Sequence, residues 1–253
     1  MPTNTNYSLG WLPDLPDSRD FMYAPPMSIA ESLPTFADLR TGCPPVYDQG
    51  HLGSCTANAL AGAFEFDLKK QSKPDFMPSR LFIYYNERVL INTVNSDSGA
   101  YIRDGIKTMN KDGVCPENEW PYDIAKFTQK PPAKCYKDAL KSQIKSYRRL
   151  INTLNQLQGC LAEGFPFVFG FTVYESFMTQ EVANSGIMPM PKRSEKVMGG
   201  HAVMAVGYDD KRQVFIVRNS WGKEWGDDGY FYMPYAYITD TNRCDDFWTI
   251  RLI

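Results

Sequence analysis

The two halves of this sequence favour different kinds of secondary structure. Five runs in the second half are rich in Val, Ile, Phe and Tyr and lie between turn-forming residues, which is typical of β-strands. These runs span residues 165–173, 201–209, 213–220, 229–235 and 246–253. Such a concentration of strands predicts that this half of the chain builds a sheet.

Helix-forming segments dominate the first half. Residues 54–70, 79–90 and 101–111 combine strong helix formers with start or stop signals, and a fourth helix is expected at 151–163, before Gly164. The Pro- and Lys-rich stretch 126–141 is the expected crossover between the halves, and the basic cluster 145–150 is expected to be a solvated face. We therefore predict an α+β fold.

Composition excludes several classes of protein. A chain of 253 residues with 43% hydrophobic residues and both charge signs interspersed is typical of a globular protein. A formal net charge of -2 gives no basic surface that would attract nucleic acid. No apolar run reaches the roughly 20 residues that cross a bilayer, and no secretory signal is visible at the start. We expect a soluble protein in an unknown compartment, without a membrane or nucleic-acid partner.

Residues 1–32 are expected to form an extended N-terminal arm. The segment contains five prolines together with large apolar residues at Trp11, Leu15 and Phe21. It is too apolar for a simple linker, so we expect these side chains to pack on the body. They would do so either across a cleft, as a short latch, or elsewhere, adding only stability.

Cys55 is a candidate nucleophile because of its local sequence, DQGHLGSC at 48–55. The residue would lie in the first turn of the helix at 54–70. A thiol at a helix N-terminus beside a histidine has a lowered pKa, because both neighbours favour the thiolate. A buried or disulfide-bonded thiol is the alternative on residue type alone.

The partner histidine is expected to be His201 rather than His51. His51 lies in a tight loop, where an exposed histidine is the ordinary outcome, whereas His201 opens a strand after two glycines. Asn219 follows in RNSWGKEWGDDGY and could fix one ring nitrogen while the other faces the thiol, which is the arrangement of covalent catalysis. A histidine that only satisfies a buried neighbour is the alternative.

The six cysteines give no metal-binding spacing. They are Cys43, Cys55, Cys115, Cys135, Cys160 and Cys244. Without CxxC pairs, and with only two histidines, no metal site is predicted. If Cys55 is a free thiol, five cysteines are left, so at least one more is unpaired within the chain.

Four motifs together resemble the papain-like cysteine peptidases. They are a Gln six residues before the nucleophile (Gln49), then GSC at 53–55, HAV at 201–203 and NSWG at 219–222. LPTFADLR at 33–40 looks like the start of the mature enzyme, so the resemblance covers 33–253. It implies a mainly helical lobe at about 33–140, a barrel-like antiparallel β lobe at about 141–253, and a cleft between them.

The resemblance also implies the roles of single residues. Cys55 would be the nucleophile, His201 the general acid and base, Asn219 the residue that orients it, and Gln49 an oxyanion donor. The substrate-binding residues would be Ser98 and Gly99 in a glycine-rich segment, with Gly199, Gly200 and Trp221. Peptides or proteins would be the substrates, and no cofactor is required.

Several departures from the family pattern bear on this reading. Leu52 stands where the family often has a disulfide cysteine, and Thr56 stands where an aromatic residue commonly follows the nucleophile. Gly200 stands directly before His201, where papain has an Asp, so that negative charge is absent here. The arm is too short and too rich in proline to be the long helical prosegment of the family. Phe169, Gly170 and Phe171, with Gly199, are expected to line an apolar substrate pocket.

Two other functions stay open from the sequence. One is a catalytically inactive scaffold of the same fold that binds peptides or a partner protein. The other is acyl transfer, in which an amine replaces water on the same thioester.

Overall fold

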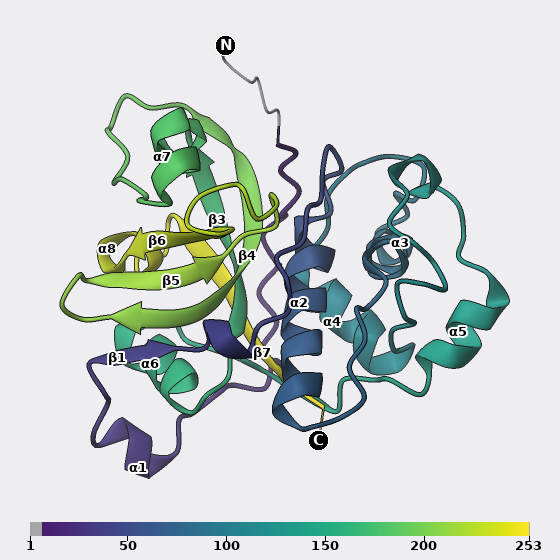
Figure 1. Cartoon of the computed structure of the whole chain (residues 1–253), viewed down its shortest axis with the longest axis horizontal. Coiled ribbons are helices and arrows are strands. Elements are labelled where there is room, and N and C mark those ends of the chain that lie inside the picture. The colour runs from purple at the N-terminus through teal and green to yellow at the C-terminus, as the bar shows by residue number, and fades with distance from the viewer. Residues whose placement is uncertain (1–6, 253) are drawn as a thin grey trace.

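The computed structural model describes residues 7–252, which form a helical half and a sheet half side by side (Figure 1). The arm enters at the junction of the two halves, where it bonds to Gly200 on β4 and to Ala100 before α4, and then continues to the sheet half (Figure 1). Among residues 7–252, no helix combines the length and the apolar character that crossing a membrane requires.

The three helices predicted in the first half are present. They are α2 (Cys55–Lys70), α3 (Arg80–Leu90) and α4 (Ile102–Lys111). The Ser79 hydroxyl caps α3 by accepting the Phe82 N–H, and Lys69 and Lys70 end α2 where the helix dipole favours positive charge. The other helices are α1 (Met27–Ala30), α5 (Ala133–Ala139), α6 (Leu154–Ala162), α7 (Gln180–Ser185) and α8 (Tyr235–Ile238), with 3₁₀ turns η1 (Arg40–Gly42), η2 (Ile124–Lys126) and η3 (Glu175–Met178).

All five strand predictions in the second half also hold, within a few residues at each end. The strands are β1 (Phe36–Asp38), β2 (Ser146–Arg149), β3 (Phe167–Tyr174), β4 (Val197–Asp209), β5 (Val214–Arg218), β6 (Tyr230–Pro234) and β7 (Cys244–Arg251). They pair antiparallel in the order β2-β7-β3-β4-β5-β6, and β1 adds to β4. Within residues 7–252 no pairing joins β2 to β6. The α+β fold with an antiparallel sheet lobe is therefore confirmed, although the sheet stays open and does not close into a barrel; bulges in β3 and β4 bend it.

The basic cluster 145–150 is not the solvated face that was expected. Ser146–Arg149 forms the edge strand β2, which pairs with β7, and three of its four residues are half-buried. The Arg149 guanidinium binds Asp20, Asp245 and Asp246, so its charge is used within the protein. Sequence composition alone could not show these partners, because they lie far away in the chain.

Helix α2 positions the centre of the molecule. Its residues from Cys55 to Leu68 are all buried, as expected for a helix enclosed on every side. It packs against β4, and Gly62 lets the Arg218 side chain approach, since a Cβ there would lie 3.3 Å from Arg218 Nε. The packing of α2 on β4 brings the helix that begins at Cys55 against the strand that carries His201.

Candidate active site

Cys55 is the first residue of α2 and is fully buried. Backbone N–H groups of Ala202, on β4, and of Gly10, in the arm, lower the pKa of its thiol. Burial raises the pKa of the thiol to about 12, and these N–H groups offset only part of that effect. The expectation of a lowered pKa therefore does not hold with the arm in place, because desolvation outweighs the helix N-terminus.

His201 lies on β4, one residue before Ala202, and is also fully buried. Its Nε2 bonds to Asn219 Oδ1 at 2.8 Å, and its ring stacks on Trp221 at 4.7 Å between centroids. Nδ1 has no hydrogen-bond partner within residues 7–252. Burial lowers the pKa of His201 to about 4, while the bond to Asn219 acts in the opposite direction. The structure thus brings His201 and Asn219 together as the sequence indicated.

Gln49 is buried, and its side-chain amide is held in one orientation. Its Oε1 accepts the Ser220 hydroxyl at 2.7 Å, which leaves Nε2 to donate. Nε2 donates to the carbonyl of Leu52 at 2.9 Å and to the carbonyl of Ser8, in the arm, at 3.0 Å. The amide donor of Gln49 is therefore already engaged with a peptide carbonyl of the arm.

The arm binds to both halves through its backbone. Trp11 N–H donates to the Gly200 carbonyl at 3.0 Å, and Leu12 N–H donates to the Ala100 carbonyl at 3.0 Å. In return, Ala100 N–H donates to the Gly10 carbonyl at 2.8 Å, which makes a parallel β-bridge. The arm passes so close to Gly99 that a Cβ there would lie 2.2 Å from the Gly10 oxygen. The two halves therefore bind the backbone of the arm as they would an added β-strand.

Trp11 fills a pocket in the sheet half and is only 7% exposed. A Cβ at Gly170 would lie 1.9 Å from its ring, so this glycine opens the pocket. At the far end, Trp11 Nε1 donates to Asp246 Oδ2 at 3.0 Å. Phe169 and Phe171 do not line the pocket as expected: they pack in the core of the sheet half, because alternate residues of β3 face opposite sides.

Charged residues hold the arm beyond Trp11. Asp20 binds Arg103 at 2.6 Å and Arg149 at 3.2 Å, while Arg149 also binds Asp246 at 3.2 Å. Asp14 N–H donates to Asp246 Oδ2 at 2.7 Å, which places two carboxyl groups side by side. Burial raises the pKa of Asp246 to about 7, and the neighbouring Asp14 adds to this shift.

The other predicted arm and substrate residues have different outcomes. Tyr7 stacks on Trp221 at 4.2 Å, and a Cβ at Gly199 would lie 3.0 Å from Leu9. The Ser98 hydroxyl donates to Thr93 and to the Gly99 carbonyl. The expectation that Leu15 and Phe21 pack on the body is wrong, since they are 75% and 64% exposed, whereas Trp11 packs as expected.

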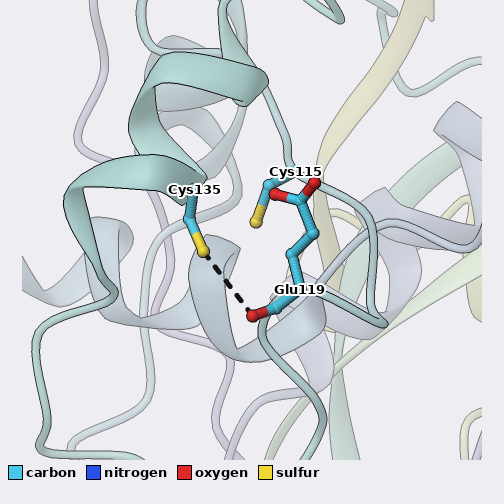
Figure 2. Close-up of side chains that lie close together, drawn as sticks. All are labelled: Cys115, Glu119 and Cys135. Atoms are coloured by element: carbon cyan, nitrogen blue, oxygen red, sulfur yellow. Dashed lines mark hydrogen bonds between the residues drawn. The ribbon is translucent and has the colours of Figure 1, made fainter.

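A second group of reactive side chains lies outside the site. Cys115, Glu119 and Cys135 each place one possible ligand atom within 4.8 Å of the others (Figure 2). These residues could hold a metal ion, although their spacing resembles no zinc motif. Within residues 7–252 all six cysteines carry free thiols.

Comparisons with known proteins agree with this arrangement. A family model described as papain family cysteine protease matches residues 33–245. The solved structure of xylellain, a cysteine protease from Xylella fastidiosa, is similar with a TM-score of 0.91 and 48% identity, covering 98% of this chain and 97% of xylellain.

Two sequence relatives point the same way. An uncharacterized peptidase C1-like protein of Acanthamoeba polyphaga mimivirus is 52% identical over 213 residues, which are 81% of this chain and 68% of the relative. Cathepsin B-like CP2 of Giardia intestinalis is 29% identical over 242 residues, which are 91% of this chain and 71% of the relative. The chain therefore belongs to the papain family of cysteine proteases and is a hydrolase of the cysteine peptidase class.

Proposed function

We propose that Cys55 hydrolyses peptide bonds through a thioester acyl-enzyme, with His201, Asn219 and Gln49 as its partners. The bond from Gln49 Nε2 to the Ser8 carbonyl carries this proposal. It supports the presence, six residues before Cys55, of a fixed amide donor that a peptide carbonyl reaches without rearrangement of the protein. Fixed donors of this kind stabilise the oxyanion that develops in the transition state.

The reaction would follow from the geometry in four steps. His201 takes the Cys55 proton through Nδ1, and Asn219 fixes the ring through Nε2. The thiolate then attacks the substrate carbonyl carbon, while Gln49 Nε2 and the Cys55 backbone N–H donate to the oxyanion. His201 protonates the leaving amine, and the same residue activates the water that hydrolyses the thioester.

The arm would keep this chemistry off by occupying the cleft. Its backbone bonds to Gly200 on one side and to Ala100 on the other, so a substrate could not bind in the same place. By burying Cys55 and His201 it also favours the neutral forms of both, which removes the thiolate that the reaction needs. Activity would therefore require the arm to leave the cleft.

Trp11 indicates what side chain the enzyme would prefer in this pocket. The walls around Gly170 suit an apolar body, and the Asp246 carboxylate at the end accepts a hydrogen-bond donor. We expect substrates whose side chain here combines an apolar stem with a donor or a positive charge, as in Arg, Lys or Trp. This refines the purely apolar preference that the sequence indicated.

Cleavage of fluorogenic peptide amides tests the proposal. Cys55→Ser should abolish cleavage, whereas Cys160→Ser, which changes another fully buried thiol, should leave it intact. Both variants should be compared with the unaltered chain and in a form whose arm is weakened by Trp11→Ala. If none of these proteins cleaves any peptide, the inactive binding scaffold replaces the proposal; ligated products in place of cleaved ones would indicate acyl transfer.

A further inference from the structure

Cys115, Glu119 and Cys135 meet at the outer side of the helical half. Cys115 and Glu119 lie four residues apart in the loop after α4, and Cys135 lies in the first turn of α5. Figure 2 shows the two thiols and the Glu119 side chain gathered in one place, and their ligand atoms all lie within 4.8 Å of one another. None of the three takes part in the chemistry proposed for Cys55.

The polar atoms of this cluster are incompletely satisfied. Cys115 and Cys135 are 0% and 1% exposed. Glu119 Oε1 accepts from Lys134 Nζ at 2.8 Å, but Glu119 Oε2 is buried and has no hydrogen-bond partner within the described part of the chain. Burying a carboxylate oxygen without a donor is costly, so a cation at this oxygen would remove the penalty.

We propose that Cys115, Cys135 and Glu119 bind one thiophilic divalent cation of the zinc(II) class. Two thiolates select such ions over magnesium or calcium, and a carboxylate oxygen is an accepted third ligand. With bonds of about 2.0–2.3 Å, tetrahedral ligand atoms lie about 3.3–3.8 Å apart, so small inward movements of the side chains suffice. A water molecule would complete the coordination.

Charge and hydrogen bonding favour a cation over a disulfide between the two cysteines. Binding releases the two thiol protons to water. Two thiolates, one carboxylate and a divalent ion then leave a single negative charge, and the Lys134 ammonium already binds the same carboxylate. A Cys115–Cys135 disulfide would need an oxidant and would still leave Glu119 Oε2 without a partner. The cation satisfies all three groups at once.

The site would cross-link a part of the fold that has its own small core. Cys115 and Cys135 belong to a small apolar cluster with Phe82 and Ala139, separate from the two main cores. The same loop continues to Tyr122, whose hydroxyl donates to the Gln49 carbonyl at 2.9 Å. A cation that cross-links the loop to α5 would therefore stabilise the side of the molecule that supports Gln49.

Cobalt(II) titration of the reduced full-length protein tests this proposal. The measurement uses a Cys55→Ala background, because a thiol beside His201 could bind metal by itself. We expect saturation at one cobalt per chain, with a thiolate-to-cobalt band in the near ultraviolet and intense visible bands of tetrahedral coordination, both removed by one equivalent of zinc. Zinc should also raise the melting temperature.

Variants assign the signal to these residues. Cys115→Ser and Cys135→Ser should abolish the thiolate band, and the isosteric Glu119→Gln should weaken cobalt affinity about tenfold or more. Cys160→Ser, a buried thiol elsewhere, should change nothing. The proposal is overturned if the reduced protein gives no thiolate-to-cobalt band, if the band survives in Cys115→Ser, or if mass spectrometry of protein purified without reductant shows a Cys115–Cys135 disulfide and reduction restores no metal binding.

Discussion

Replacing Trp11 by Ala should release the arm from the cleft. Trp11 is 7% exposed, packs over Gly170 and donates to Asp246. Truncating a buried tryptophan costs about 3–5 kcal/mol. Because Trp11 belongs to the arm, the loss should appear mainly as weaker docking. At 1.4 kcal/mol per factor of ten, the docking equilibrium should shift by about 100-fold or more.

The rate at which Cys55 reacts with an epoxysuccinyl inhibitor measures this shift. If the thiol reacts only when the arm is open, the second-order rate constant follows the open fraction. It should therefore rise by about 100-fold or more in Trp11→Ala, up to the plateau that is reached once the arm is fully open. Cleavage of a peptide amide should rise in parallel.

Two arm residues supply matched controls. Leu15→Ala and Phe21→Ala remove large side chains of the same arm that are 75% and 64% exposed, so they should change the inactivation rate less than about twofold. A Trp11→Ala protein that unfolds at a lower temperature yet reacts no faster would show that the arm does not gate Cys55.

Three further predictions concern the site. Gln49→Ala should lower turnover about 100-fold or more with little change in KM, because about 3 kcal/mol of oxyanion stabilisation is lost; a near-normal turnover would refute its role. Asp246→Asn, assayed with the arm displaced, should reduce kcat/KM for a substrate with Arg in the Trp11 pocket about tenfold or more relative to Leu, and an unchanged ratio would exclude Asp246 as the determinant. Burial raises the pKa of Asp246 to about 7 in the docked state, and burial also raises that of Asp14. The docked state therefore binds protons more tightly than the open state, so docking is strongest below about pH 4 and weakens as the pH rises through 7. The docking equilibrium changes by at most about tenfold per pH unit for each proton involved. Amide exchange at Ala100, corrected for its intrinsic rate, should report more opening at pH 8 than at pH 5, and the reverse order would contradict the coupling.

The sequence was most informative where local signals decide the structure. The caps and helix formers around 54–70 and 79–90 predicted α2 and α3, and the apolar runs predicted β3 to β7. The contact between His201 and Asn219 was expected from the order of the motifs, and the roles of Cys55, His201 and Asn219 stay predictions. Each of these predictions depended on residues close together in the chain or on a recognised pattern.

Other parts of the site could not be predicted because they depend on distant contacts. Ala100 binds the arm through its backbone N–H and carbonyl. Almost every residue carries these groups, so the sequence could not identify Ala100 as a contact. Asp246 reaches Trp11 across 235 positions of sequence. The pKa of Cys55 was expected to fall, yet burial raises it to about 12, because the pKa of a thiol depends on how much of it the folded chain removes from water.

Labelling of the thiols tests the proposed mechanism most directly. The purified protein and its Trp11→Ala form are titrated with an epoxysuccinyl inhibitor, the modified residue is mapped by mass spectrometry, and peptide amide cleavage is followed in the same samples. We expect one label per chain, on Cys55, with cleavage lost in proportion and faster in Trp11→Ala. Cleavage that persists after complete labelling of Cys55, or is lost through a different cysteine, would contradict the assignment of the nucleophile.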